Sequence, residues 1–434
     1  MTGNPASRDQ GRRLRILYLH QHFSTPDGAT GTRSFAMARA LAARGHAVTI
    51  ACGRYAGAAT GLAGPLCRGW REGRVGAFQV VEYAIPCGNA QGLVARAAAF
   101  LRYAARAGAL ALAGPAAAMP RTPPATPPRA ARPRRWDVLI ASSTPLTVAL
   151  PALAAWRLRG LPFVFEIRDL WPELPRAMHI GTPPLWAALD RLADAACRHA
   201  AAVVALSDGM AETALAHGAT PARLHVVPNG ADLDLFGPQV APWRPPEAPP
   251  HEALAVYAGA HGPANGLDQL LDAAAVARGA PLRLLLVGQG AEKPRLMARA
   301  AALGLGHVNF LDPLPKPRLA ALLAASQIGV LCLAPVAAFA EWTAPNKLMD
   351  YLAAGLPVVA NQNVAAGRLL REGPCGVAVP PGDAAAFGQA MAALAADPVR
   401  RAGMGLAARA LAVRRYDWRL LAQRFCDVVE AAAR

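Results

Sequence analysis

The chain is poor in lysine and in acidic residues. Only three of its 434 residues are lysines, Lys293, Lys316 and Lys347, against 42 arginines and 28 aspartates and glutamates. We interpret the excess of arginine as the bias of a GC-rich bacterial genome. The net charge of +17 favours anionic partners, which include nucleic acid, acidic lipid surfaces and phosphorylated substrates. Because the sequence has neither zinc-finger spacing nor an aromatic-rich RNA-binding motif, we expect no nucleic-acid partner.

Paired cysteines are also lacking. The seven cysteines are scattered without a Cys-x-x-Cys pair and are Cys52, Cys67, Cys87, Cys197, Cys332, Cys375 and Cys426. Several fall in apolar stretches, so we expect them to be buried as small hydrophobic side chains in a reducing cytoplasm. The histidines and cysteines show no zinc-binding spacing, and no metal is expected.

No long uninterrupted apolar run is present. The longest apolar region, residues 93–119, is broken by Arg96, Arg102 and Arg106 and is therefore a poor membrane span. Residues 1–9 are polar and do not read as a signal peptide. We therefore expect a cytoplasmic protein that meets the membrane only from its surface.

A dinucleotide-binding motif is missing after the first predicted strand. Residues 27–33 are rich in glycine but lack the Gly-x-Gly-x-x-Gly spacing, which disfavours NAD or FAD and leaves no cofactor expected. Gly28 and Gly31 instead permit the backbone to approach a ligand closely at a helix N-terminus, beside Thr32 and Arg33. A tight strand-to-helix turn without a ligand is the alternative.

What the sequence does contain is a regular alternation of strands and helices. Strand-like runs form two series, at residues 14–20, 47–51, 78–84, 138–141, 163–167 and 203–206, and at residues 254–257, 282–287, 308–311, 328–332, 357–360 and 377–379. Helical patterns lie between most of them. This alternation predicts an α/β protein with two Rossmann-like, doubly wound domains.

Proline-rich stretches mark the predicted boundaries. Residues 237–250 lack periodicity and are interpreted as a linker between an N-terminal domain, 1–236, and a C-terminal domain, 251–414. Residues 415–434 follow, with a helix expected at 418–432. Within the first domain, residues 120–135 are rich in proline and arginine and contain no acidic residue, which predicts a mobile, extended loop.

Two basic segments could meet an anionic membrane surface. For the loop at 120–135, contact with lipid headgroups and a disordered insertion from compositional bias both remain open. Residues 92–112 could form a helix with arginines between apolar residues, and either an interfacial helix or a plain surface helix fits this pattern.

The second half contains a predicted anion site. A helix opens at Pro345, Asn346 and Lys347, and Gly355 ends it. Its N-terminus offers unpaired backbone N–H groups, and Lys347 adds a full positive charge where a diphosphate would lie. Asp350, one turn inside, is placed to accept ribose hydroxyls. An ordinary capped helix with a surface lysine is the alternative.

Six segments, taken in order, resemble the retaining glycosyltransferases of family 4: residues 27–33, 142–145, 166–173, 227–232, 287–290 and 341–360. The last resembles the family's donor-binding signature and is most similar to the WbuB-like branch, whose helix opens with Pro-Asn-Lys or Pro-Ser-Lys. Asp350 occupies the place of the signature's second acidic residue. Glu341 stands one position before the place of the first, which Trp342 occupies.

This resemblance implies the GT-B fold, in which the two domains face a cleft and the last helix packs back on the N-terminal domain. It implies transfer of a hexosyl or N-acetylhexosaminyl group from a UDP-sugar, with retention of configuration. The basic surface suits an acceptor on a polyprenyl diphosphate lipid, or a saccharide, in bacterial surface polysaccharide synthesis. The expected location is peripheral, at the inner face of the cell membrane.

The resemblance also assigns site residues. Asp169, Arg168 and Glu341 are the expected catalytic residues, and the donor is expected to bind Lys347, Asn346, Asp350, Gly288, Gly290, His261 and Gly262. Family members commonly carry an arginine and a lysine on the loop at 259–266, where this chain has no fixed cation. Charge compensation is therefore expected from Lys347, the helix ends and His261.

Other interpretations stay open. Asp232 and Asp234 form an Asp-x-Asp triplet, the metal motif of another glycosyltransferase fold, but they follow a turn signal at Asn229 and Gly230, so we expect no metal dependence. A sugar-nucleotide epimerase of similar fold would bind UDP but need no acceptor. A non-catalytic scaffold of a polysaccharide assembly complex would bind UDP weakly or not at all.

Overall fold

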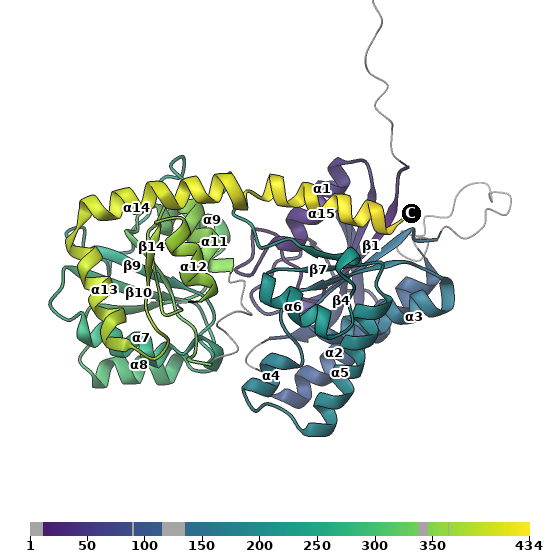
Figure 1. Cartoon of the computed structure of the whole chain (residues 1–434), viewed down its shortest axis with the longest axis horizontal. Helices are drawn as coiled ribbons and strands as arrows, with labels where there is room; N and C mark the ends of the chain where they lie inside the picture. The colour runs from purple at the N-terminus through teal and green to yellow at the C-terminus, as the bar shows by residue number, and fades with distance from the viewer. Residues whose placement is uncertain (1–11, 89–90, 115–134, 337–345, 363) are drawn as a thin grey trace, which may run out of the picture.

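The computed structural model describes residues 12–88, 91–114, 135–336, 346–362 and 364–434. These residues form two parallel sheets with helices around each, side by side in the molecule (Figure 1). The predicted α/β class with two doubly wound sheets is confirmed. The expected loop at 120–135, apart from its last residue, and the expected catalytic residue Glu341 lie outside the described residues.

The first sheet has eight strands in the order β3-β4-β2-β1-β5-β6-β7-β8. Their bounds are β1 Arg15–Leu19, β2 Ala47–Tyr55, β3 Trp70–Val75, β4 Phe78–Cys87, β5 Val138–Ser142, β6 Phe163–Ile167, β7 Ala202–Ala205 and β8 Leu224–Val226. All neighbours pair in parallel except β3 and β4, which form an antiparallel hairpin. Sequence reasoning missed β3, which is polar and partly exposed, and β8, which has only three residues.

Helices cover both faces of this sheet. They are α1 Arg33–Ala43, α2 Leu93–Ala113, α3 Ala149–Arg159, α4 Glu173–Ala177, α5 Pro183–His199 and α6 Asp208–Ala216. Alternating residues of β1 separate two apolar cores, because Leu17 and Leu19 join one buried cluster while Ile16 and Tyr18 join the other. The first core contains α2, α3 and α5, and the second contains α1.

The second sheet has six parallel strands in the order β11-β10-β9-β12-β13-β14. Their bounds are β9 Ala253–Ala258, β10 Leu282–Val287, β11 Val308–Leu311, β12 Ile328–Leu331, β13 Val358–Ala360 and β14 Gly376–Ala378. The helices around it are α7 Leu267–Val276, α8 Lys293–Ala302, α9 Lys316–Ala324, α11 Asn346–Ala354, α12 Ala365–Glu372, α13 Ala384–Ala396 and α14 Pro398–Leu411. Residues 237–250, which precede this half, contain no helix or strand.

The last helix crosses between the halves. After α14, a π-helical turn at Ala412–Tyr416 leads into α15, Trp418–Ala432, and the two helices run across the top of both halves in Figure 1. α15 buries Trp418, Leu421 and Phe425 in the same cluster as β1. The side chain of Asp417 caps its first turn by accepting a hydrogen bond from the backbone N–H of Arg419.

The strand order positions the ligand-binding edges. In the first sheet the order reverses between β1 and β5, and in the second between β9 and β12. Open α/β sheets bind ligands in the crevice at such a reversal, beyond the carboxyl ends of the strands. The loops after β1, β5, β9 and β12 are therefore where a site is expected.

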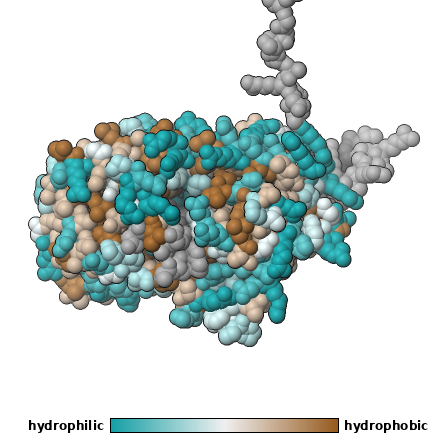
Figure 2. All heavy atoms as spheres, in the orientation of Figure 1, coloured by the Kyte–Doolittle hydropathy of each residue, from teal (hydrophilic) through white to brown (hydrophobic). Residues whose placement is uncertain are grey.

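The face of the molecule seen in Figure 2 mixes polar and apolar residues, as on ordinary globular proteins. No helix in the described ranges is long and apolar enough to span a membrane. All seven cysteines are free thiols; six are buried as predicted, but Cys67 is exposed, because it lies in the loop before β3.

Candidate active site

The carboxyl edges of the two sheets face each other. A side chain at Gly31, in the loop after β1, would lie 3.0 Å from Asn346 Nδ2 and 3.7 Å from a terminal nitrogen of Arg168. The backbone N–H of Lys316, at the start of α9, donates to Pro26 O at 3.2 Å. The structure thus brings together Gly31, Arg168 and Asn346, three of the predicted site residues, from three distant segments.

Arg168 follows β6 directly and is fixed by neutral groups. Its backbone N–H donates to Ser143 Oγ at 3.1 Å, and its guanidinium donates to His20 Nε2 at 2.7 Å. His20 Nδ1 lies 2.7 Å from Ser34 Oγ. Sequence reasoning missed His20, although a polar residue at the end of the first buried strand, predicted at 14–20, was a usable signal.

Arg33 does not face the site, which corrects its assignment to a ligand-binding loop. The side chain turns beneath α1, where its Nε lies 2.7 Å from Glu166 Oε1, and both side chains are fully buried. Tyr18 and Ser142 donate to the other oxygen of Glu166 at 3.0 and 2.6 Å. Although burial opposes it, the charges of Arg33 and Arg168 lower the pKa of Glu166 below its usual value.

In the rest of the loop before α1, Gly28 is buried and Thr32 is partly accessible. A Cβ at Gly28 would lie 2.3 Å from Ser24 Oγ and 2.7 Å from the backbone nitrogen of Ala59. Gly28 is therefore required by a tight turn against the neighbouring loop, and not by a ligand. Thr32 is the N-cap of α1 but makes no capping hydrogen bond with its side chain.

Lys347 lies at the carboxyl edge of the second sheet among neutral groups. Its Nζ donates to Tyr257 Oη at 3.0 Å and to Asn265 Oδ1 at 3.1 Å. No carboxylate forms an ion pair with it within the part of the chain that the structure describes. Burial lowers the pKa of Lys347 to about 8. The amine lies 2.9 Å from the Cβ position of Gly259, so it supplies a cation beside the very loop that has none of its own.

The loops after β9 and β10 touch through their backbones. A Cβ at Gly288, where φ is +151°, would lie 1.9 Å from Gly259 O, and one at Gly290 would lie 2.2 Å from His261 O. Neither position has room for a side chain. The loops after β9 and β10 therefore pack closely at Gly259, the residue beside the amine of Lys347. Gly262 faces open space.

His261 cannot supply the positive charge expected of it. The side chain is fully buried, and both ring nitrogens lack a hydrogen-bond partner among the described residues. Burial, and then the charges of Lys293 and Lys347, lower the pKa of His261 to about 4, so the ring is neutral near pH 7. The ring therefore brings no positive charge to this edge of the sheet.

Asp350 is already paired. Its Oδ2 lies 2.5 Å from Nζ of Lys316, and both side chains are largely buried. Burial raises the pKa of Asp350, and the lysine opposes that shift. A ribose would therefore meet a carboxylate shared with Lys316, a partner that the sequence did not reveal.

Asp169 is exposed beyond β6, and its carboxylate accepts a hydrogen bond from Thr144 Oγ1. The loop continues into α4, where Glu173 Oε1 lies 2.6 Å from His217 Nε2, and His217 Nδ1 lies 2.7 Å from Asp194 Oδ1. Glu173, Asp190 and His217 are close enough to consider as metal ligands. Because Asp190 also pairs with Arg176, at 2.6 Å, the group is better described as an ion-pair network that ties α4 to α5 and the end of α6.

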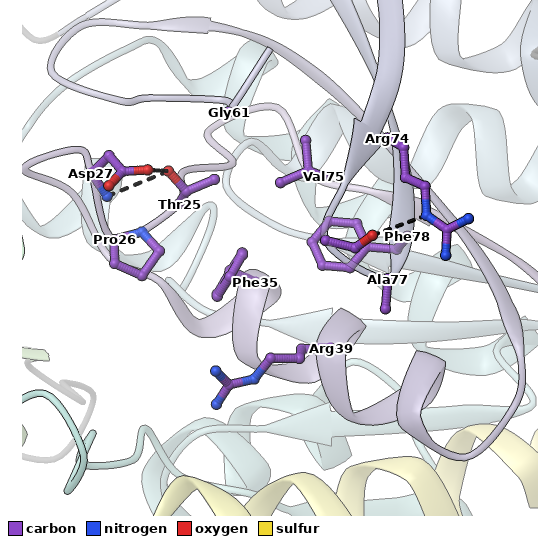
Figure 3. A pocket seen from close by; sticks show the side chains of 11 residues that line it. Thr25, Pro26, Asp27, Phe35, Arg39, Gly61, Arg74, Val75, Ala77 and Phe78 are labelled. Carbon is purple, nitrogen blue, oxygen red and sulfur yellow. Dashed lines mark hydrogen bonds between the residues drawn. The ribbon is translucent and has the colours of Figure 1, made fainter.

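A separate pocket of about 330 Å³ lies on the outer side of α1. Figure 3 shows Phe35 and Arg39 of α1 together with Arg74 and Phe78 of the β3–β4 hairpin around it. Asp27, the first residue of the predicted loop at 27–33, lines it together with Thr25 and Pro26, but none of the predicted site residues does.

Two family models match the chain. The glycosyl transferase 4-like domain matches residues 28–230, and the glycosyl transferases group 1 model matches residues 252–397. A phosphatidyl-myo-inositol mannosyltransferase from Mycobacterium leprae is 33% identical over 220 residues, which are 48% of this chain and 53% of that protein. A D-inositol 3-phosphate glycosyltransferase from Kribbella flavida is 33% identical over 221 residues, 48% of this chain and 50% of its own. The matches thus span about half the length of these relatives.

Solved structures show the same fold. A sucrose-phosphate synthase from Thermosynechococcus elongatus aligns with a TM-score of 0.68 at 19% identity, covering 95% of this chain and 97% of that one. HepE from Anabaena, solved in complex with UDP-glucose, aligns with a TM-score of 0.64 at 18% identity, covering 96% and 99%. These likenesses confirm the predicted GT-B arrangement of two Rossmann-like domains.

Proposed function

Because the chain belongs to the glycosyltransferases built from a 4-like domain and a group 1 domain, we propose that it transfers a sugar from a UDP-sugar, with retention of configuration. In the proposed reaction the bond between the anomeric carbon and the diphosphate oxygen breaks, and the acceptor oxygen bonds to the same face. The hydroxyl proton passes to the departing diphosphate.

The observation that carries this proposal is the unneutralised charge of Lys347. Lys347 is partly buried, and a desolvated cation without a counter-ion is costly. Its retention at the reversal of the second sheet therefore favours an anionic ligand there. α11 begins at Asn346, directly before Lys347, and the N-terminus of a helix favours a bound anion. Charge that develops on the departing diphosphate would be stabilised by both.

The choice of UDP and of acceptor rests on the relatives. HepE was solved with UDP-glucose, which favours a uridine donor. The mycobacterial relative is named for a lipid acceptor that carries a phosphate, and an anionic lipid-linked acceptor would suit the net charge of +17. We propose a polyprenyl-diphosphate-linked or saccharide acceptor, used in surface polysaccharide synthesis at the inner face of the cell membrane.

α2 supports the membrane part of this proposal. Its first turns expose Leu93 and Val94, which are 60% and 85% accessible, and Leu101 is 57% accessible further along. Arg102 and Arg106 are exposed on the same helix. Apolar side chains with basic neighbours suit the interface of an anionic bilayer. Val94→Glu with Leu101→Glu should reduce co-sedimentation with anionic vesicles and leave UDP binding unchanged, while unchanged sedimentation would contradict this docking.

The test of the donor site is Lys347→Met. We expect UDP affinity, measured by calorimetry, to fall about ten- to a hundredfold, the value of one charge-assisted contact to a phosphate. Arg278→Met is the matched control, because it removes one positive charge from the exposed surface of the same half. Unchanged UDP affinity in Lys347→Met would refute the site.

Product analysis separates the competing functions. Incubation with UDP-sugars and lipid-linked acceptors, read by mass, should give a glycosylated acceptor and UDP. Conversion of the UDP-sugar without an acceptor would indicate an epimerase. Lack of both product and UDP binding would indicate a scaffold.

A further inference from the structure

His20 occupies a position that the proposed reaction does not yet use. It is the first residue after β1, at the reversal of the first sheet, and its side chain is 3% accessible. One ring nitrogen meets Ser34 of α1 and the other meets Arg168, which is 148 residues away in sequence. The imidazole therefore joins three segments around the edge that faces the donor half.

The hydrogen bonds determine the state of this ring. A guanidinium can only donate, so Nε2 of His20 must present its lone pair to Arg168 at 2.7 Å. A ring that keeps that lone pair is neutral and carries its proton on Nδ1, which donates to Ser34 Oγ at 2.7 Å. Burial, and then the charges of Arg168 and His22, also hold the pKa of His20 well below its ordinary value.

A neutral acceptor has a consequence for Arg168. The carboxylate nearest in sequence, Glu166, already pairs with Arg33 and accepts from Tyr18 and Ser142. Arg168 forms no ion pair with a carboxylate among the described residues. Its guanidinium is thus fixed in direction by His20 without losing its charge, and it lies beside Gly31, which faces Asn346 of α11.

We propose that His20 is a positioning residue, whose neutral imidazole orients Arg168 so that the full guanidinium charge faces the diphosphate of the nucleotide sugar. The inference rests on the proposed function, because it assumes a diphosphate at this edge. It adds a second cation from the N-terminal half, opposite Lys347.

Three substitutions test the proposal with UDP as the probe. His20→Gln keeps a neutral acceptor and should retain most of the UDP affinity. His20→Leu removes the acceptor and should weaken UDP binding about tenfold, the size of one oriented charge-assisted contact. His20→Glu keeps an acceptor but neutralises Arg168, and it should weaken UDP binding at least as much as His20→Leu. A purely structural role predicts that UDP affinity follows the melting temperature of the variants instead, and that order would overturn the proposal.

A double-mutant cycle shows whether His20 acts through Arg168. On an Arg168→Leu background, His20→Leu should add less than about a twofold further loss of UDP affinity, because the partner is already gone. Full additivity of the two losses would overturn the proposal.

Two readouts separate this inference from the proposed function. The first is nitrogen NMR of labelled histidines, with His20→Gln to assign the signal. It should show the Nδ1–H tautomer of His20 at pH 7, and the pattern of signals typical of this tautomer should be lost in Arg168→Leu. An imidazolium or an Nε2–H tautomer would overturn the positioning role.

The second readout is pH dependence. Lowering the pH should weaken UDP binding in the wild type more than in His20→Gln. The charged and titratable groups around the ring are Arg168 and His22, with the Arg33–Glu166 pair behind and Tyr103 near the backbone of His20. The carboxylate of Glu166 also titrates at acid pH, so the difference between the wild type and His20→Gln is the part that reports His20. Failure of the donor site itself is read independently, from Lys347→Met.

Discussion

The two halves of the molecule place cations at equivalent edges of similar sheets but treat their charge differently. In the first half Arg33 is buried against Glu166, and the pair is completed by Tyr18 and Ser142. In the second half, among the described residues, Lys347 donates to the neutral partners Tyr257 and Asn265. Because a desolvated charge is costly unless it is paired, the first arrangement suits a structural role, and the second suits the anionic ligand proposed for this edge.

Arg168 lies between these two extremes. It is oriented, as Arg33 is, but by a neutral imidazole, so it keeps its charge, as Lys347 does. From Arg33, Arg168 and Lys347 we infer a rule for this fold. A basic residue at the carboxyl edge of a sheet indicates an anionic ligand only when the protein groups that it contacts are neutral. Of the four predictions below, three test this rule and the one on His217 tests an ion-pair network of the first half; they run from the largest expected effect to the smallest.

The largest effect is expected for Glu166→Gln. The substitution leaves Arg33 fully buried without a counter-charge, and we expect the free energy of unfolding to fall by about 3–5 kcal/mol. Chemical denaturation measures it. Glu372→Gln is the control, because it breaks an exposed pair with Arg415 and should cost less than about 1 kcal/mol. Equal losses in the two variants would contradict the structural role of the buried pair.

The contacts of Arg33 and Lys347 show which parts of the fold and of the candidate site could be predicted from the sequence. Strand periodicity located most strands and both sheets, and the helix at 418–432 was predicted with the bounds that the structure gives it. Arg33 and Lys347 looked alike, since each is a basic residue at the start of a helix that follows a loop. They differ in partners that lie 133 residues away for Arg33, and 90 and 82 residues away for Lys347. The pattern of neighbouring residues in the sequence cannot predict such contacts, because the partners come together only when the chain folds.

Asp350 and Lys316 are the second half's counterpart of the buried pair. Asp350→Asn leaves Lys316 largely buried and unpaired, and we expect a loss of about 2–3 kcal/mol in the free energy of unfolding. Combining it with Lys316→Met should restore most of that loss, because no isolated charge remains. If Asp350→Asn instead leaves stability unchanged and weakens UDP binding, the carboxylate serves the ribose and the pair is incidental. Denaturation and calorimetry on the same variants decide.

His217 makes the first half sensitive to alkaline pH. Its hydrogen bond to Glu173, opposed by burial and reinforced by Asp194, raises the pKa of His217 to about 9. A raised pKa contributes stability that is fully present below the unfolded value near 6.5 and is lost as the pH rises through 9.

We therefore expect about 2 kcal/mol of the wild-type free energy of unfolding to be lost between pH 6.5 and 9.5. In His217→Gln this alkaline decline should be absent. A titration of stability in both proteins measures it, and a decline of the same size in the variant would show that other groups cause it. Because the network ties α4 to α5, UDP affinity at pH 7 should change little.

The smallest effect has the opposite sign and tests the comparison most directly. Lys347→Met removes a partly buried cation that no carboxylate compensates within the described residues, at the expense of two hydrogen bonds to Tyr257 and Asn265. The relief of burial and the lost contacts are similar in size, so we expect the free energy of unfolding to stay constant or to rise by about 1 kcal/mol. The same variant is expected to bind UDP poorly. A residue that holds the fold together, as Arg33 does, cannot behave in this way, because its removal destabilises. A clear loss of stability in Lys347→Met would place Lys347 with Arg33 and erase the distinction between the halves, whereas constant stability with weakened UDP binding identifies a charge that the fold carries for its ligand.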